Sequence, residues 1–342
     1  MSMITPEALQ VEIAKGAFKP NLYLTNMTMA YFQAQSDYVA KSIFPMLPVQ
    51  LSTASYYEFS RADLARDNMR RKPQFGKVEP AQMGMSDKSY RCYVDQVIVG
   101  LDKINTLDFG RSKAPGVADP RKAKAKFIAE QMNIHLDVLF AQGFFNEGIW
   151  KHEFEGGTNF SDTDNTFVKF NDDNCNPIVL FDNLATRMKK AGRRKPNKLA
   201  LGENAFNALK ANPAVLERVK FGGSSANPAS VNERVLAELF GLEKVVVFGS
   251  TYNKAGLGEE EDMDFICNPN DALLVHSTDT PAIDEPTAGY IFTWDMLGNG
   301  NFMATQQFEG EGGTHTEFME GLMATDMKKT SDELAIYLNG CV

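Results

Sequence analysis

The pattern of apolar and polar positions begins with an irregular segment and an apolar anchor. In residues 1–40, Pro6, Gly16 and Pro20 interrupt any long helix. Residues 43–49 follow with the sequence Ile-Phe-Pro-Met-Leu-Pro-Val, whose two prolines favour an extended path through apolar residues. We therefore expect an N-terminal arm that this apolar segment anchors to a core.

Two predicted strands enclose a long polar segment. Residues 56–59 and 90–101 are rich in aromatic and β-branched side chains, which predicts strands. Residues 61–89 are mostly Arg, Lys, Asp, Gln, Gly and Pro, and their few apolar side chains could not build a core. These are Leu64, Met69, Phe75, Met83 and Met85. Because structureless loops longer than ~12–15 residues are uncommon unless functional or disordered, the pattern predicts a long β-hairpin that a neighbouring molecule holds.

One long amphipathic helix follows. Asp119 and Pro120 form a helix start, since Asp accepts from free amides and Pro fits the first turn. Apolar positions then recur at helical spacing over residues 120–145, roughly 35–40 Å at ~1.5 Å per residue. The stripe consists of Ile128, Met132, His135 and Leu139, widened by Phe127, Ile134 and Val138. On this stripe His135 is predicted to be a core histidine rather than a ligand.

The second half alternates helices and strands. Residues 146–176 are polar and rich in Gly, Asn and Asp, which predicts a surface connection between subdomains. A capping box of Ser230 with Glu233 should begin a helix that ends at Gly241. Further helices are predicted over 178–191, 205–210 and 214–219, and strands over 198–201, 244–248, 272–276, 290–294, 302–308, 315–323 and 334–338. The fold class is α+β, without an internal repeat.

Composition narrows the class of protein. A chain of 342 residues exceeds the size of one growing core, so two or more subdomains are expected. A net charge of -9 argues against a protein that clamps nucleic acid over its whole surface. The four cysteines form no CxxC pair and no secretion signal is visible, which favours buried free thiols in a reducing cytoplasm. No window approaches the ~18 apolar residues of a membrane span.

The sequence contains no pattern that supports catalysis. It has no GxxxxGK[ST] loop, no GxGxxG turn and no GxSxG turn, and four histidines are a small supply for a metal site. Two pairs of Asp residues in the predicted linker favour a solvated segment over a calcium site, because neither pair is followed by the Gly that the turn of a calcium loop requires. They are Asp162, Asp164, Asp172 and Asp173. We expect no cofactor, no metal and no enzymatic activity.

Five segments, in this order and spacing, carry a family resemblance. They are FPMLPV at 44–49, YYEF at 56–59, PNKLALG at 196–202, LERVK at 216–220 and LFGLEKVVV at 239–247. Together with the long helix they resemble the major capsid proteins of tailed double-stranded DNA bacteriophages, the Hong Kong 97 type fold. The resemblance covers nearly the whole chain.

The resemblance implies a subunit architecture and a role. Residues 1–51 would be the N-terminal arm, 52–100 an extended loop over a neighbour, 101–175 with 300–342 the peripheral domain with its spine helix, and 176–299 the axial domain. The chain would self-assemble through pentamers and hexamers into the icosahedral head of a virion, in the cytoplasm of the host bacterium. It would enclose double-stranded DNA without sequence-specific binding and would have no membrane partner. A separate scaffolding protein, a portal and a decoration protein are the other candidate partners.

Two alternatives remain beside the capsid. An encapsulin-like nanocompartment would load a cargo enzyme instead of a genome. A cytosolic α+β enzyme would use carboxylates such as Asp172 and Asp173 in a deep pocket.

The basic tip of the predicted hairpin is the candidate subunit contact. Its residues have no core to join within one subunit, and a projecting hairpin with few apolar anchors has little stability of its own. We expect the tip to lie against an acidic surface of an adjacent subunit. The residues are Arg66, Arg70, Arg71 and Lys72.

Overall fold

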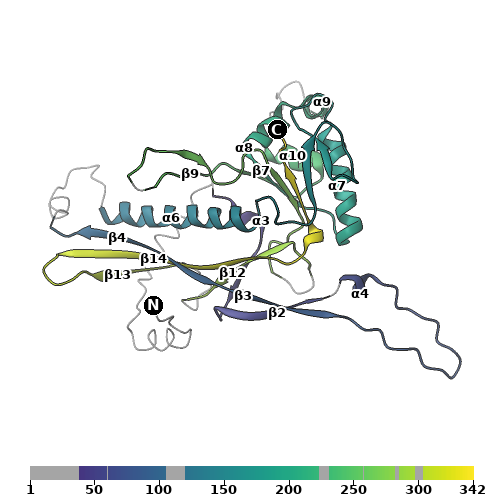
Figure 1. Ribbon diagram of the computed structural model, residues 1–342, viewed down its shortest axis with the longest axis horizontal. Coiled ribbons are helices and arrows are strands. Elements are labelled where there is room, and N and C mark those ends of the chain that lie inside the picture. The colour runs from purple at the N-terminus through teal and green to yellow at the C-terminus, as the bar shows by residue number, and fades with distance from the viewer. Residues whose placement is uncertain are drawn as a thin grey trace.

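Two sheets and a projecting hairpin form the body of the protein (Figure 1). The computed structural model describes residues 38–59, 61–104, 120–222, 231–256, 258–281, 285–296 and 303–342. Beside the main sheets, β9 (Thr251–Asn253) and β10 (Met263–Phe265) form a short antiparallel ribbon. No described helix is both long and apolar enough to cross a membrane.

The first sheet has five strands around the long strand β14. They are β1 (Met46–Val49), β12 (Gly289–Trp294), β14 (Thr316–Lys329), β13 (Met303–Glu309) and β4 (Tyr93–Asp102). Strands β13 and β4 pair with the first part of β14, and β12 pairs with its end, all antiparallel. Strand β1 adds to β12 in the parallel direction.

The long helix α6 (Pro120–Gly143) lies across this sheet (Figure 1). Gly321 of β14 makes the close approach possible, because a Cβ there would lie 2.5 Å from Ile128 and from Met132. The predicted helix is confirmed, but the prediction of His135 as a core residue is wrong, since its side chain is 42% exposed. A helix on a flat sheet buries a narrow stripe, and Phe127 and His135 fall on its flank.

The second sheet has six strands and is covered by helices on one face. In spatial order its strands are β6 (Thr166–Val168), β5 (Glu153–Gly157), β15 (Ala335–Asn339), β11 (Ala272–Val275), β7 (Lys198–Gly202) and β8 (Lys244–Phe248). The helices are α7 (Pro177–Gly192), α8 (Glu203–Ala211), α9 (Pro213–Gly222) and α10 (Glu233–Phe240). The 3-10 turn η1 (Asp332–Leu334) leads into β15.

The central strands of this sheet join two separate cores. Leu199 and Leu274 pack with the helices, whereas Ala200 and Leu273 face the core that also contains α6. All four side chains are fully buried. Burial on both faces explains why residues 199–202 of β7 and all of β11 are apolar runs without polar alternation.

The apolar anchor of the arm is confirmed. Helix α3 (Ala40–Ile43) leads to Phe44, whose ring lies 4.4 Å from Phe144 and 6.0 Å from Phe140 between centroids. The following strand β1 pairs with β12. Residues 1–37 lie outside the described part of the chain.

The structure corrects three local predictions. The strand predicted over 90–101 is broken at Cys92, whose amide donates to Ser52 O, so β3 (Met85–Arg91) and β4 join different sheets. The predicted surface connection 146–176 contains β5 and β6, with Phe154 and Phe167 fully buried. Helix α10 begins at Glu233 with Asn232 as its cap, so Glu233 cannot close a capping box; Ser230 lies outside the described residues.

The remaining elements agree with the sequence in type and nearly in extent. Helices α7, α8 and α9 and the strands β7, β8, β11, β12, β13 and β15 occur where the pattern predicts them. Strand β14 begins near the predicted position but continues to Lys329, six residues beyond its predicted end. Gly241 ends α10 in the left-handed region at φ 67°. The four cysteines are free and buried, as expected.

Candidate assembly surfaces

The hairpin of β2 (Thr53–Phe59) and β3 is the feature that projects from the body (Figure 1). The strands pair from Thr53 with Arg91 to Phe59 with Met85. The short helix α4 (Arg61–Ala65) follows β2, and residues 66–84 then run without helix or strand to β3. We call residues 53–91 the extended loop and residues 66–84 its tip.

The base of the extended loop is fixed by aromatic stacking on the five-stranded sheet. The Tyr90 ring stacks on Phe292 with 4.5 Å between centroids, and Tyr56 lies 5.5 Å from the same ring. The Tyr90 hydroxyl donates to Leu51 O. These contacts hold the direction in which the loop leaves the body.

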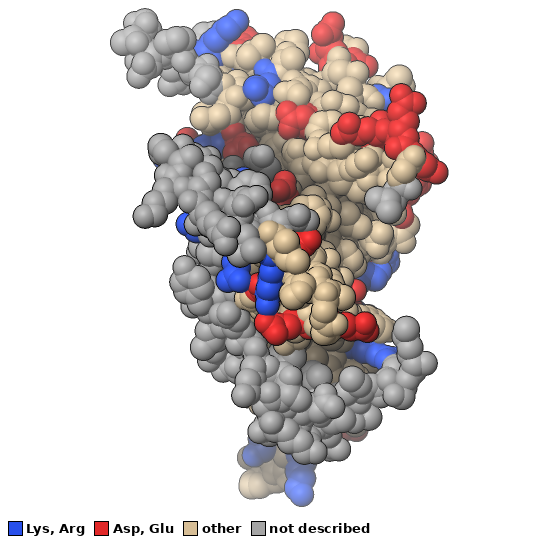
Figure 2. Space-filling view, turned by 90° about the vertical axis from the view of Figure 1, so that its left-hand side faces the viewer, with Lys and Arg blue, Asp and Glu red and all other residues tan. Residues whose placement is uncertain are grey.

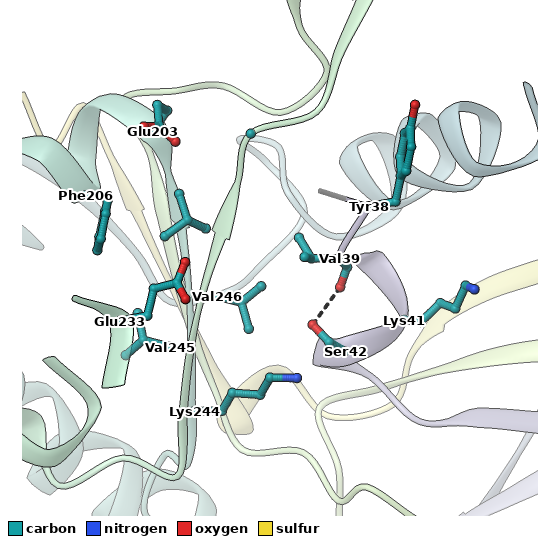
Figure 3. Close-up of a pocket in the computed structure, with 12 residues that line it drawn as sticks. Tyr38, Val39, Lys41, Ser42, Glu203, Phe206, Glu233, Lys244, Val245 and Val246 are labelled. Carbon is teal, nitrogen blue, oxygen red and sulfur yellow. Dashed lines mark hydrogen bonds between the residues drawn. The ribbon is translucent and has the colours of Figure 1, made fainter. Parts of the chain in front are cut away.

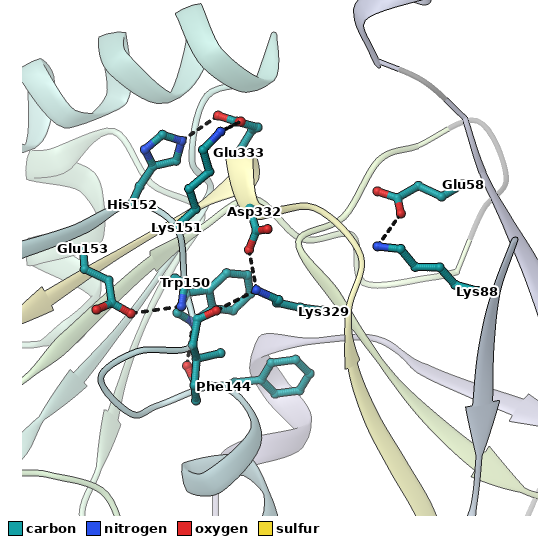
Figure 4. A network of polar contacts seen from close by, with 11 residues as sticks. Glu58, Lys88, Phe144, Trp150, Lys151, His152, Glu153, Lys329, Asp332 and Glu333 are labelled. Atoms are coloured by element: carbon teal, nitrogen blue, oxygen red, sulfur yellow. Dashed lines mark hydrogen bonds and ion pairs between the residues drawn. The ribbon is translucent and has the colours of Figure 1, made fainter. Parts of the chain in front are cut away.

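Two polar contacts extend this support along the loop. Lys88 on β3 pairs with Glu58 on β2 at 2.6 Å, and this pair raises the pKa of Lys88 (Figure 4). Farther out, the Arg193 guanidinium at the end of α7 donates to Leu64 O of α4. The tip beyond α4 is exposed.

The structure places the four predicted contact residues on this exposed tip. Arg66 lies 3.7 Å from Asp63 within the loop, and Arg70 lies 3.3 Å from Glu79. The Arg70 and Glu79 side chains are 69% and 85% exposed, so water screens their attraction and it contributes little. Arg71 and Lys72 are also exposed. The internal acidic partners of Arg66 and Arg70 were not predicted from the sequence.

Apolar side chains on the loop are exposed as well. Phe75 is 99% exposed and Met69 is 90% exposed, and Leu64, Met83 and Met85 exceed half. Phe75 also has φ 62°, a region that non-glycine residues rarely adopt. The structure therefore presents an aromatic side chain to solvent from a strained turn, a feature that composition alone did not reveal.

A second group of polar contacts ties residues 149–152, which lead into β5, to the end of β14 and to η1 (Figure 4). Glu333 accepts from Lys151 at 2.8 Å and lies 2.6 Å from His152 Nε2. Lys329 bridges Ile149 O and Asp332. These pairs join segments about 180 residues apart in sequence and stabilise the junction of the two sheets.

Among the cavities on the described surface, three lie near the elements discussed above. The cavity in Figure 3, about 780 Å³, lies between α3 and the edge strand β8. A second, about 600 Å³, lies beside the base of the extended loop, and a third, about 330 Å³, lies between α6 and β4. None of the predicted contact residues lines any of them.

Asp137, an acid with a raised pKa, is held by hydrogen bonds within the core. It is fully buried on α6 and accepts from Ser250 Oγ at 2.7 Å and from the Ala40 amide at 3.3 Å. Burial raises the pKa of Asp137 to about 6, against these hydrogen bonds and the charge of Lys41, which lower it. Burial lowers the pKa of Lys41 to about 7. These contacts of Asp137 join helix α3 to the long helix α6.

The described residues bring no catalytic constellation together. Among them no cluster of His, Cys, Asp or Glu could hold a metal ion. Burial raises the pKa of Cys92 to about 12 and of Cys175 to about 11, so both thiols stay protonated. Asp172 is half-buried and accepts from Asn174 in a turn, and Asp173 is exposed; neither lines a cavity described above.

Charge is unevenly distributed over the surface. Figure 2 shows Asp and Glu side chains gathered on the upper right of one face, with few Lys or Arg among them. The described surface therefore offers acidic regions as well as the basic tip of the extended loop.

Comparison with solved structures gives the same architecture. A phage-related protein from Bordetella bronchiseptica RB50 superposes with a TM-score of 0.68 at 16% identity, over 94% of this chain and 97% of that one. The capsid of the cyanophage P-SCSP1u gives 0.51 at 11% identity, over 86% of both chains. The holo-encapsulin complex of Synechococcus elongatus PCC 7942 gives 0.50 at 11% identity, over 90% and 89%. No protein-family model and no curated protein matches the sequence.

These similarities cover most of the chain on both sides. The protein therefore has the α+β fold of phage capsid and encapsulin shells, the Hong Kong 97 type, as the sequence predicted.

Proposed function

We propose that this protein is the major capsid protein of a tailed double-stranded DNA bacteriophage. The observation that carries the proposal is the extended loop, whose basic and apolar tip is exposed on a fold shared with shell-forming proteins. Exposed Phe and Met side chains on a projecting loop are typical of an interaction surface, and a shell subunit would cover them on assembly. The chain acts by association and performs no reaction.

The division of the subunit follows from this role. On this proposal residues 1–51 are the arm, 52–100 contain the loop that reaches a neighbour, 101–175 with 300–342 are the peripheral part, and 176–299 are the part around the axes of pentamers and hexamers. The extended loop itself ends at Arg91, because β4 belongs to the five-stranded sheet. Strand β15 lies in the six-stranded sheet, so the C-terminus joins the two parts. The basic residues Arg66, Arg70, Arg71 and Lys72 contact an acidic surface of the adjacent subunit.

The proposed setting is a virion assembled in the host cytoplasm. A separate scaffolding protein, a portal and a decoration protein are the proposed partners, with DNA held inside without sequence-specific contacts. A net charge of -9 suits a wall that holds DNA without adhering to it.

An encapsulin-like compartment is the second candidate, because an encapsulin shell shares the fold at a TM-score of 0.50. The two differ in content: a capsid takes up DNA through a portal, and a compartment takes up a cargo enzyme.

Negative-stain electron microscopy and light scattering of the purified chain, alone and with the products of neighbouring genes, test the proposal. Closed shells or rings of five and six are expected. A monomer at high concentration, even with a scaffolding protein supplied, would refute the proposal. Nuclease-protected DNA in particles from infected or induced cells distinguishes the capsid from the compartment.

A further inference from the structure

Helix α7 ends at a residue with a costly backbone conformation. Arg193 closes the helix in the left-handed region at φ 64°, and its amide donates to Lys189 O at 2.9 Å. Side chains other than Gly are strained in this region, so Gly is the usual residue at this position of a helix. Helix α10 follows the usual pattern, because Gly241 ends it in the same conformation at φ 67°. The two helices thus end in the same turn, and in α7 an arginine makes it.

Close packing explains the glycine that precedes Arg193 but not the arginine itself. A Cβ at Gly192 would lie 2.6 Å from Glu333 O and from Leu334 Cδ2, so the approach of α7 to η1 requires a glycine there. The left-handed residue follows one position later. Because a glycine at position 193 would make this turn with less strain, the backbone gives no reason for an arginine. The reason should lie in what the side chain contacts.

The Arg193 side chain reaches the extended loop. Its Nη1 donates to Leu64 O at 3.1 Å, across 129 residues of sequence. Leu64 is the fourth residue of the five-residue helix α4, and the last four carbonyls of a helix have no partner within it. A cation at this end also complements the negative end of the helix dipole. The guanidinium therefore caps α4 from another part of the subunit.

This cap gives the extended loop a second point of support. The first is its base, where Tyr90 stacks on Phe292 and Tyr56 lies against the same ring. A hairpin that is supported only at its base can swing about that base. Figure 1 shows α4 at the far end of β2, where the loop passes beneath the end of α7. A bond at this point restricts the direction in which the tip beyond α4 extends.

The bond is suited to fixing geometry rather than to stabilising the fold. Both Arg193 and Leu64 are exposed, so water competes for the guanidinium and the net free energy of the bond is small. The strain at Arg193 offsets part of what remains. A segment that is already ordered, however, loses less entropy when it binds a partner, which favours association. An arginine at this position therefore affects association more than stability.

We propose that Arg193 is a positioning residue for assembly, which clasps α4 and sets the direction of the extended loop in the unassembled subunit. The effect on assembly rests on the proposed function. The clasp itself is a property of the isolated subunit, so it can be tested without any particle.

The variant Arg193→Gly separates loop order from stability. It removes the guanidinium and relieves the backbone, so the melting temperature of the subunit should stay the same or rise. Pulsed electron paramagnetic resonance between spin labels on Met69→Cys at the tip and Asn183→Cys on α7 measures loop order. The distribution of distances should be narrow with Arg193 and should broaden with Arg193→Gly. Both labelled positions are exposed and the four natural cysteines are buried, so labelling is selective.

Three matched variants complete the comparison. Arg193→Ala removes the guanidinium and keeps the strain, so it should broaden the distribution without raising the melting temperature. Arg193→Lys retains a cation that can cap α4 and should restore part of the order. Arg194→Ala removes the neighbouring exposed cation and should leave both the distribution and the melting temperature unchanged.

The isolated subunit decides whether the clasp exists. A distribution as narrow with Arg193→Gly as with Arg193 would overturn the proposal. Equal broadening with Arg194→Ala would overturn it too, since a general loss of positive charge would then be the cause. A lower melting temperature without broadening would show that Arg193 acts only in the fold, and the clasp would be wrong.

Assembly of the unlabelled chain tests the consequence of the clasp. Arg193→Gly should raise the protein concentration at which particles form by about 2-fold to 10-fold, the range for loss of one preorganised contact. An unchanged threshold with a loosened loop would overturn the role in assembly and leave the proposed function intact. Absence of particles from the wild-type chain under every condition would refute the proposed function, whereas the labelled subunit would still decide whether the clasp exists.

Discussion

Reversal of charge at the loop tip is the sharpest test of the electrostatic part of assembly. In the variant Arg70→Glu, Arg71→Glu, Lys72→Glu, three side chains change from +1 to -1, so each loop changes by 6 charges. Within the subunit this removes the exposed pair of Arg70 with Glu79 and places like charges there instead. Because that pair is screened by water, the free energy of unfolding should change by less than ~1 kcal/mol.

The effect on assembly should be larger than the effect on folding. Each exposed ion pair contributes ~0–1 kcal/mol, and reversal replaces attraction with repulsion of similar size, so about 1–3 kcal/mol is lost at each loop contact. Each subunit of a ring donates one loop and receives one, which makes one contact per subunit. Since ~1.4 kcal/mol corresponds to tenfold, the concentration threshold should rise roughly 10-fold to 100-fold.

Light scattering and sedimentation across a salt series measure this threshold. The gap between variant and wild type should narrow toward ~1 M salt, where the Debye length falls to ~3 Å. The matched control Lys189→Glu, Lys190→Glu, Arg194→Glu reverses three exposed cations at and after the end of α7 and should assemble normally. Normal shells from the loop variant at every salt concentration would refute the contact. Unfolding of its isolated subunit would show that the loop packs internally.

Three further perturbations test the fold that positions the loop. Gly321→Val should destabilise the subunit by at least ~1–3 kcal/mol, because its side chain would overlap α6, and thermal melting measures this; an unchanged melting temperature would contradict the close packing of helix and sheet. Phe140→Ala should cost ~3–5 kcal/mol in chemical denaturation, whereas a cost below ~1 kcal/mol would show that the ring is not a core residue. The pKa of Asp137 is raised to about 6 in the folded chain from its ordinary value of 3.8. Protonation of Asp137 therefore stabilises the folded chain fully at pH values below 3.8, and this stabilisation is lost as the pH rises through 6. The free energy of unfolding of wild type relative to Asp137→Asn should therefore fall by up to ~3 kcal/mol between pH 4 and 7, and a flat difference would contradict the burial of this acid.

Elements with strong periodicity and clear end signals were predictable from the sequence. Helix α6 begins at Pro120 and ends within a few residues of the predicted end, because its apolar spacing and its start signal agree. Strands β7 and β11 were predictable as apolar runs between turn residues, since burial on both faces leaves Lys198 at the start of β7 as their one polar position.

Short strands in polar sequence were not predictable in this way. Strands β5 and β6 are 5 and 3 residues long, and each supplies one fully buried ring, Phe154 and Phe167, within a polar segment. Their pairing depends on β15, which lies more than 160 residues away in the chain. No local pattern carries that information, so tertiary contact decided the structure of residues 146–176.

For the candidate contact too, the sequence predicted the local feature, a basic tip, but not the partners of its residues. The sequence indicated a basic tip without a core, and the structure places those residues on an exposed, projecting loop. It also pairs Arg66 with Asp63 and Arg70 with Glu79 inside the loop, so half of the predicted contact charges already have an acidic neighbour. The attraction left for a second subunit then rests chiefly on Arg71 and Lys72. Two screened cations give weak specificity. We therefore expect the exposed apolar side chains of the tip, Phe75 and Met69, to contribute to the contact beside them.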